Sequence, residues 1–177
     1  MRIADATKAD VGPLAALMAA SPLLRRYGVT ARGARASLRE ALRERDLLLV
    51  AHDAGAVVGL AWVITTRALD RSAYLRLLLV GEGDRSRGAG SELLSRAERR
   101  SHAAGCRHLV LLVTATNRRA RAFYRRHGYR HVGGLASFVR RGIREALYVK
   151  DLSRAGASGG GRSRAGTPRR SRRAAAR

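Results

Sequence analysis

The sequence contains a single cysteine, Cys106, among its 177 residues, so an internal disulfide is excluded and a reducing compartment is expected. No apolar run approaches the roughly 20 residues that a membrane-spanning helix needs. The N-terminal segment Met1–Asp5 lacks the apolar stretch of a secretory signal. The 5 histidines do not show the spacing of metal ligands. These absences predict a cytoplasmic protein with no membrane span and no metal site.

Acidic residues are also scarce, since 13 of them face 36 lysines and arginines and the formal net charge is +23. Lysine itself occurs only at Lys8 and Lys150, and every other cation is arginine. A functional interpretation is attraction to nucleic acid or another polyanion. The abundance of arginine and alanine favours a second interpretation, which is a compositional bias of a GC-rich coding sequence.

Residues 153–177 contain no valine, isoleucine, leucine or aromatic residue, although they include eight arginines. Such a segment cannot bury enough apolar surface to offset its ordering entropy. We therefore predict one folded domain over residues 1–152 and a disordered Arg-rich basic tail over 153–177. The tail either binds anions weakly, nucleic acid included, or is an inert solvated segment.

Hydrophobic periodicity and turn signals within residues 1–152 divide this part of the chain into strands and helices. We predict strands at Arg2–Asp5, Leu47–Asp53, Ala56–Thr66, Tyr74–Val80, His108–Thr114, Tyr129–Gly133 and Glu145–Leu152. We predict helices at Asp10–Ala20, Thr30–Arg45, Ser91–Ala104 and Asn117–His127, with Asp10 as an N-cap. Hairpins followed by strand–helix–strand units are typical of an α/β fold with a mixed sheet and helices on both faces.

The stretch RSRGAG, Arg85–Gly90, joins the Tyr74–Val80 strand to the following helix. The first amides of a helix lack intrahelical partners, and the helix dipole adds positive charge there, so this junction suits an anion such as a phosphate. Gly88 and Gly90 allow close approach of the backbone, and Arg85 and Arg87 add charge. Neither a nucleotide triphosphate loop nor a dinucleotide-binding fingerprint fits this spacing.

A second stretch, NRRARAFYRRHGY, runs from Asn117 to Tyr129. Asn117 follows a strand, where its side chain caps a helix or hydrogen-bonds an extended ligand. The alternative is an ordinary amphipathic helix with Phe123 in the core and Tyr124 at its margin. Taken alone, this stretch does not separate the two interpretations.

Together the two stretches resemble the GNAT superfamily of acyl-CoA-dependent N-acyltransferases. The first matches the family pattern Arg/Gln-x-x-Gly-x-Gly/Ala, and the second matches Asn-x-x-Ala-x-x-Phe-Tyr-x-x-x-Gly-Phe/Tyr through Asn117, Ala120, Phe123, Tyr124, Gly128 and Tyr129. The resemblance implies a mostly antiparallel sheet with one splayed pair of strands. The segment around Gly142, Glu145, Leu147 and Lys150 is similar to a RimI-like, poorly characterised bacterial subgroup.

The resemblance also implies that acetyl-CoA is the cosubstrate and that its acetyl group passes directly to a primary amine. Amides of residues 87–91 would hold the pyrophosphate, the strand backbone around Leu78 would pair with the pantetheine arm, and Tyr124 would protonate the leaving thiolate as a general acid. A backbone amide of that strand would stabilise the oxyanion. The complete set of expected cofactor-binding residues is Leu78, Val80, Arg85, Ser86, Arg87, Gly88, Ala89, Gly90, Ser91, Asn117 and Tyr124.

The sequence offers three candidates for the base that takes a proton from the amine. Glu82 is the nearest acid after the Tyr74–Val80 strand, Glu145 is a second candidate, and a water chain is the third. Both carboxylates also fit a role as solvated surface groups. Arg76 would lie near the acceptor and would disfavour polyamines.

The acceptor itself is a small-molecule amine or a protein amine, and homodimers are common in the family. Two other functions stay open at this point. In the first, the protein binds nucleic acid or acetylates aminoacyl-tRNA. In the second, it senses acyl-CoA without turnover.

Overall fold

The computed structural model describes residues 1–66, 68–85 and 87–153. The predicted phosphate-loop residue Ser86 and the predicted tail from residue 154 onward lie outside the described residues. Within the described part of the chain, no helix combines the length and the apolar character that crossing a bilayer would require.

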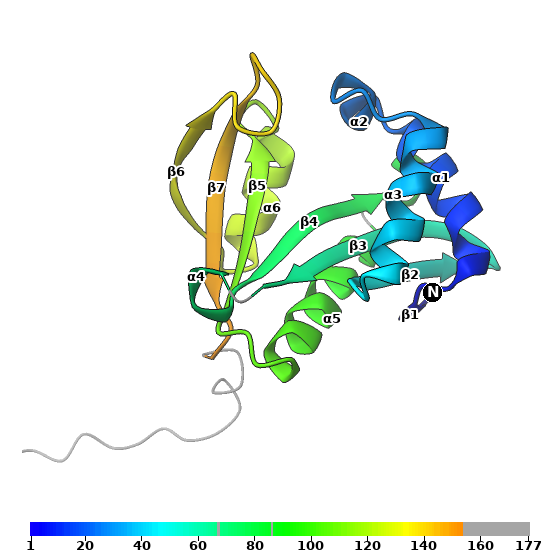
Figure 1. The fold of residues 1–177 in the computed structure, drawn as a ribbon, viewed down its shortest axis with the longest axis horizontal. Coiled ribbons are helices and arrows are strands. Elements are labelled where there is room, and N and C mark those ends of the chain that lie inside the picture. Colours follow the sequence, from blue (N-terminus) through cyan, green and yellow to red (C-terminus); the bar gives the residue numbers. More distant parts are fainter. Residues whose placement is uncertain (67, 86, 154–177) are drawn as a thin grey trace, which may run out of the picture.

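Seven strands form one sheet in the order β1-β2-β3-β4-β5-β7-β6 (Figure 1). The strands are β1 Arg2–Asp5, β2 Leu47–Asp53, β3 Ala56–Thr65, β4 Ala73–Val80, β5 His108–Thr114, β6 Arg130–Ala136 and β7 Arg144–Asp151. The helices are α1 Val11–Ala20, α2 Pro22–Arg26, α3 Ala31–Arg43, α4 Ala68–Arg71, α5 Ala89–Ala103 and α6 Arg118–Arg126, with 3₁₀ turns η1 Lys8–Asp10 and η2 Glu82–Asp84.

The sheet is antiparallel at every pairing except that of β4 with β5, which is parallel. This parallel pairing covers only Ala73–Leu75 of β4 and 109–111 of β5. Beyond Leu75 the two strands diverge, and Figure 1 shows the sheet opening into two halves at this point. The mostly antiparallel sheet with a splayed pair of strands, expected from the resemblance, is confirmed.

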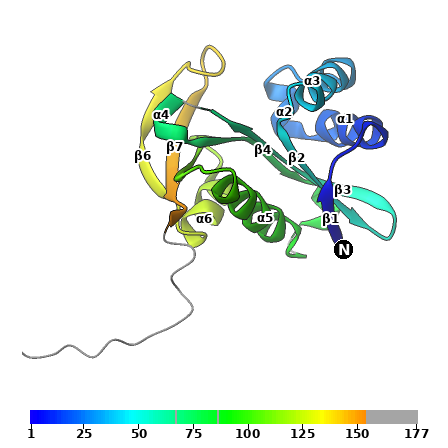
Figure 2. The same ribbon diagram turned by 60° about the horizontal axis from the view of Figure 1, so that its bottom comes forward.

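Helices cover both faces of the first half of the sheet (Figure 2). Leu93, Leu94 and Ala97 of α5 pack on one face, where alternate residues of β2 and β3 are buried against them. Helices α1 and α3 bury the intervening residues of the same strands, Trp62 among them, in a second core on the other face. A Cβ added at Gly59 of β3 would lie 2.9 Å from Leu93 Cδ1, so α5 packs directly on that glycine.

Most predicted segments agree with the observed ones to within a few residues, and the predicted hairpin turn is present at Ala54 and Gly55, both of which have positive φ. Asp10 is the N-cap residue of α1, as predicted, but its side chain does not cap the helix. Its carboxylate instead accepts hydrogen bonds from the backbone N and the Oγ1 of Thr7, at 2.7 and 2.8 Å, and closes the preceding turn. Helix α2 was not predicted.

Candidate active site

The predicted phosphate loop leads into the N-terminus of α5. Gly88 is the N-cap residue with φ of 87°, a left-handed conformation that favours glycine, and among the described residues no side chain caps this end of the helix. The amides of the first turn therefore remain available to an anion. Ala89 is buried, and a Cβ at Gly90 would meet Val80 and Phe123 only at ordinary contact distance.

The two arginines of this loop are partly balanced by acids. Arg85 lies 3.3 Å from Glu82, and Arg87 lies 3.7 Å from Asp84 and 3.8 Å from Asp53. These pairs are solvent-exposed and weak, so both guanidinium groups can reorient toward a phosphate. The cations predicted from the sequence are therefore beside the helix N-terminus, but not as unpaired charges.

The first turn of α5 is linked to the end of α6 through His127. Its Nδ1 lies 2.9 Å from the Phe123 carbonyl oxygen and its Nε2 lies 3.0 Å from Ser91 Oγ. Because a carbonyl only accepts, Nδ1 carries the proton in the neutral ring, and Nε2 then accepts from the Ser91 hydroxyl. This link brings the two sequence stretches of the resemblance together, and Ser91 is one of the predicted site residues.

The divergence of β4 from β5 leaves the β5-facing edge of β4 without a partner strand after Leu75, within the described chain. The register between β3 and β4 shifts between Trp62 and Val63, which leaves Arg76 as the extra residue of a β-bulge. Unpaired backbone groups at such an edge can pair with an extended ligand in the manner of an added strand. The predicted residues Leu78 and Val80 both lie on this segment.

A cavity of about 670 Å³ lies at the divergence and is lined by residues from both halves of the molecule. Residues from the first half include Leu24, Tyr27, Trp62, Tyr74, Arg76 and Leu78, and residues from the second half include Thr114, Asn117, Tyr124, Arg140 and Glu145. Asn117 Oδ1 accepts a 3.0 Å hydrogen bond from Ala120 N and so caps α6. Its side-chain amide keeps two donors for a ligand.

Tyr124 is 7% exposed and lines the cavity. Its ring makes edge-on contacts with Phe123 and Tyr129, at centroid distances of 5.3 and 5.4 Å. Burial raises the pKa of the Tyr124 phenol well above its ordinary value. The phenol therefore keeps its proton throughout the physiological pH range.

Glu145, at the start of β7, is the acid of this cavity and is only 2% exposed. The Tyr27 hydroxyl donates a hydrogen bond to Glu145 Oε1, and Thr114 Oγ1 lies 2.6 Å from the same hydroxyl. Because the Tyr27 proton goes to Glu145, Thr114 is the donor in the second bond. Burial and the hydrogen bond to Glu145 raise the pKa of Tyr27 to about 12.

Glu82 lies elsewhere, in the turn η2 after β4. Its side chain is 64% exposed and pairs with Arg85, and it does not line the cavity. Of the two carboxylates considered from the sequence, Glu145 is therefore the one that lines the same cavity as Tyr124. Tyr27 and Thr114 were not predicted as site residues, and no motif around either of them indicated such a role.

Two arginines contribute to the cavity, one from each half of the molecule. The Arg76 guanidinium lies 4.7 Å from the ring centroid of Trp62. Arg140 belongs to the loop between β6 and β7, and its Nη1 lies 3.0 Å from the position that a Cβ at Gly28 would occupy. The loop after α2 and the loop after β6 therefore meet at one end of the cavity.

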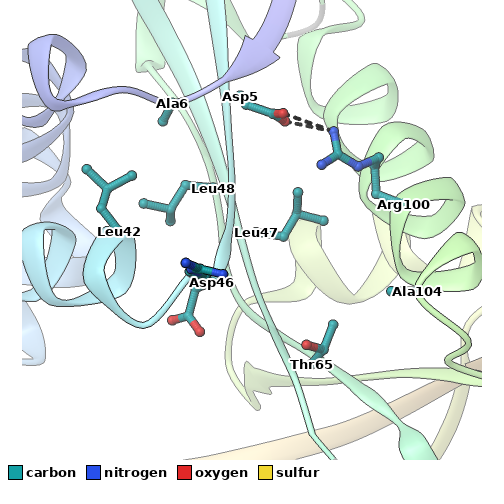
Figure 3. Close-up of a pocket in the computed structure, with 10 residues that line it drawn as sticks. Asp5, Ala6, Leu42, Asp46, Leu47, Leu48, Thr65, Arg100 and Ala104 are labelled. Atoms are coloured by element: carbon teal, nitrogen blue, oxygen red, sulfur yellow. Dashed lines mark hydrogen bonds and ion pairs between the residues drawn. The ribbon is translucent and has the colours of Figure 1, made fainter.

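A smaller pocket of about 350 Å³ lies between the end of α3, the start of β2 and the end of α5 (Figure 3). Figure 3 shows Asp5 paired with Arg100 on one side of it, with an oxygen–nitrogen distance of 2.8 Å. Asp46, also in this pocket, accepts a 2.7 Å hydrogen bond from Trp62 Nε1. Asp46 of the smaller pocket thus anchors the indole whose face supports Arg76 in the larger cavity.

Among the described residues there is no cluster of three or more histidine, cysteine, aspartate or glutamate side chains placed to hold a metal ion. Cys106 is buried, and burial raises the pKa of its thiol above the ordinary value. The thiol is therefore a poor nucleophile at neutral pH.

The sequence profile of the Acetyltransferase (GNAT) family matches residues 18–129. The uncharacterized N-acetyltransferase YhfO of Bacillus subtilis (strain 168) is 28% identical over 142 residues, which cover 78% of this chain and 95% of YhfO. Two solved structures share the fold. Ribosomal-protein-alanine N-acetyltransferase from Brucella melitensis has a TM-score of 0.72 at 22% identity, covering 85% of this chain and 99% of its own. YncA from Salmonella typhimurium, solved with its cofactor acetyl-CoA, has a TM-score of 0.70 at 18% identity, covering 85% and 93%.

Proposed function

Because the chain belongs to the Acetyltransferase (GNAT) family, we propose that it transfers the acetyl group of acetyl-CoA directly to a primary amine. One observation carries the proposal beyond family membership. The uncapped N-terminus of α5 and the unpaired edge of β4 lie along one path, and this path leads to the cavity that contains Tyr124 and Glu145. Structures of related fold are described as complexes with acetyl-CoA or coenzyme A, which supports the same ligand here.

The residues fit that ligand in three places. Backbone amides at 88–91, with Arg85 and Arg87 beside them, suit its diphosphate. The edge of β4 around Leu78 suits the extended arm with its two amide groups. Asn117 faces the cavity from the other half of the sheet and offers its side-chain amide.

The ligand supplies a thioester, and residues of the chain donate and accept the protons that the transfer requires. After the amine nitrogen attacks the carbonyl carbon, the C–S bond breaks and the sulfur needs a proton, which we assign to the Tyr124 hydroxyl. A free backbone amide of β4 stabilises the oxyanion. The nitrogen loses one proton, which we assign to Glu145, directly or through Tyr27.

The timing of the nitrogen's proton loss follows from ordinary pKa values. A lysine-like ammonium titrates near 10.4, so at neutral pH only a small fraction of the amine is in the neutral form that can attack. Once the N–C bond forms, the nitrogen becomes much more acidic. Glu145 therefore takes the proton during or after attack, and the enzyme selects the minor neutral form of the amine.

The C-terminal pattern Gly142, Glu145, Leu147 and Lys150 leads us to place the chain near the RimI-like subgroup. Ribosomal-protein-alanine acetyltransferases share its fold, which supports this placement. In the structure Glu145 lies in the cavity, whereas Lys150 pairs with Glu98 at 2.7 Å and contributes to packing.

The proposal is tested by two measurements on the full chain. Calorimetry with coenzyme A should show binding, and a thiol-release assay with acetyl-CoA should show transfer to at least one member of a panel of amino acids, polyamines, aminoglycosides, peptides and charged tRNA. Binding without transfer to any amine would favour the acyl-CoA sensor. Absence of coenzyme A binding by the folded protein would refute the proposal. Nucleic-acid affinity that falls steeply between roughly 50 and 200 mM salt would support the nucleic-acid alternative.

A further inference from the structure

We propose that the acceptor is a small primary amine that also carries an anionic group, a carboxylate or a phosphate, and that Arg76 and Arg140 bind this group. The inference rests on the proposed acetyltransferase function and assigns a class of acceptor to it. The amino group of the acceptor lies toward Glu145 and Tyr124, and its anionic group lies toward the two guanidinium groups.

The position of Arg76 depends on a connected set of contacts. The β-bulge places Arg76 next to the divergence of β4 and β5. Trp62 supports the guanidinium through its ring face, and Asp46 holds the indole through Nε1. A cation held on an aromatic face loses less freedom when it binds an anion than a freely rotating arginine does.

Arg140 reaches the same cavity from the other half of the molecule. Its guanidinium lies against the backbone of Gly28, a residue with φ of 80° in the loop after α2. Figure 1 shows α2 and the loop between β6 and β7 at the same end of the molecule. Both arginines therefore line the same cavity, one from each half of the molecule, and two guanidinium groups can bind one anion together.

Both cations lack a carboxylate partner within the part of the chain that the structure describes. Within the described residues, neither Arg76 nor Arg140 forms an ion pair with a carboxylate. Glu145, the acid among the residues that line the cavity, is occupied by the Tyr27 hydroxyl. The acceptor end of the cavity thus carries an excess of positive charge, which disfavours a polyamine and favours an anion.

The same charges assist the chemistry. Cations near the acceptor nitrogen disfavour its ammonium form and so lower its pKa, which enlarges the neutral fraction that can attack the thioester. An anionic group on the acceptor compensates for this repulsion in binding. An amine without an anionic group is repelled by the two guanidinium groups and gains no compensating attraction.

The size of the cavity favours a small molecule over a polypeptide. Its volume of about 670 Å³ includes the part beside Leu78 and Tyr124 that the thioester would fill. The contact of Arg140 with Gly28 joins the two loops at the acceptor end of the cavity.

The test compares matched acceptors in the thiol-release assay with the full chain. The pairs are 4-aminobutanoate with 4-aminobutanamide, and 3-aminopropyl phosphate with 3-aminopropanol, and spermidine is included. We expect the anionic member of at least one pair to have a kcat/KM about 10- to 150-fold above its neutral partner, as a charge-assisted hydrogen bond provides. The pair with the larger ratio identifies whether the anion is a carboxylate or a phosphate.

Variants then assign the effect to residues. Arg76→Gln and Arg140→Gln should each raise KM for the anionic amine about tenfold or more, while changing KM for the neutral partner less than about threefold. Arg76→Lys should restore part of the loss. Arg39→Gln, which removes an exposed arginine on α3 away from the cavity, is the matched control and should change neither KM.

Several outcomes would overturn the inference while leaving the transferase function intact. These are transfer to spermidine or neutral amines at equal or higher kcat/KM, faster transfer to a peptide amine than to any small anionic amine, or equal effects of the arginine variants on both members of a pair. Loss of coenzyme A binding or of transfer to every amine would instead refute the proposed function itself. Calorimetry with coenzyme A on each variant keeps the two cases distinct.

Discussion

The general-acid role of Tyr124 is the sharpest prediction of the proposed mechanism, and Tyr124→Phe tests it. The substitution keeps the ring, so its edge-on contacts with Phe123 and Tyr129 are retained. Only a hydroxyl is lost, and the change in the free energy of unfolding should stay below about 1.5 kcal/mol. A positioned proton donor contributes about 10²- to 10⁴-fold to a rate. We therefore expect kcat to fall by that factor, which corresponds to about 2.7–5.4 kcal/mol of barrier.

The assay is initial-rate thiol release at saturating acetyl-CoA, with coenzyme A affinity measured by calorimetry on the same preparations. Coenzyme A affinity should change by less than about threefold, because the hydroxyl is assigned to the leaving sulfur and not to binding. Since burial raises the pKa of Tyr124, its hydroxyl should stay protonated between pH 7 and pH 9, and the wild-type kcat should not fall in this range through loss of that proton. A well-folded Tyr124→Phe variant with kcat within threefold of wild type would show that the leaving sulfur takes its proton from elsewhere.

Three further predictions concern the base, the alkaline stability and the helix packing. Glu145→Gln should lower kcat by about 10²-fold or more at pH 7 in the thiol-release assay, with folding checked by circular dichroism, and an unchanged rate would exclude Glu145 as the base. Because the pKa of Tyr27 is raised from 10.0 to about 12, the unfolded chain loses this proton first, so the free energy of unfolding should fall from pH 10 upward. Urea titrations should show a smaller fall in Glu145→Gln, which replaces the charged acceptor of that hydrogen bond by a neutral amide oxygen. Gly59→Ala should cost about 1–3 kcal/mol in urea unfolding, since its Cβ would lie 2.9 Å from Leu93, whereas Gly83→Ala, with nothing within 4 Å, should stay within about 0.5 kcal/mol.

Local sequence patterns were sufficient to predict most of the fold. The spacing of Leu93, Leu94 and Ala97 indicates one buried face of a helix, and all three are buried in the core beneath α5. Helix α2 has only five residues, too few for a periodic pattern. Its signal was Ser21 followed by Pro22, an N-cap serine with proline at the first helical position, and Ser21 Oγ does accept a hydrogen bond from Leu24 N.

The acceptor side of the site could not be predicted in the same way. Glu145 and Arg140 reach the cavity because β7 inserts between β5 and β6, and sequence periodicity does not determine strand order. Tyr27 comes from a loop more than a hundred residues earlier and meets Glu145 only after both halves have folded. The loop at Arg85–Gly90 could be predicted because its residues are contiguous in the sequence. The position of the proton-accepting group depends instead on pairing between strands that are distant in the sequence.

The short parallel pairing of β4 with β5 has a mechanical consequence. Antiparallel pairing connects β1–β4 into one block and β5, β7 and β6 into another. Among the described residues, only three residue pairs join the two blocks within the sheet. A ligand that contacts β4 in one block and α6, which follows β5 in the other, would form a second connection between the two blocks. Hydrogen exchange at the backbone amides of Ala73–Leu75 and their partners in β5 should then slow when the ligand binds.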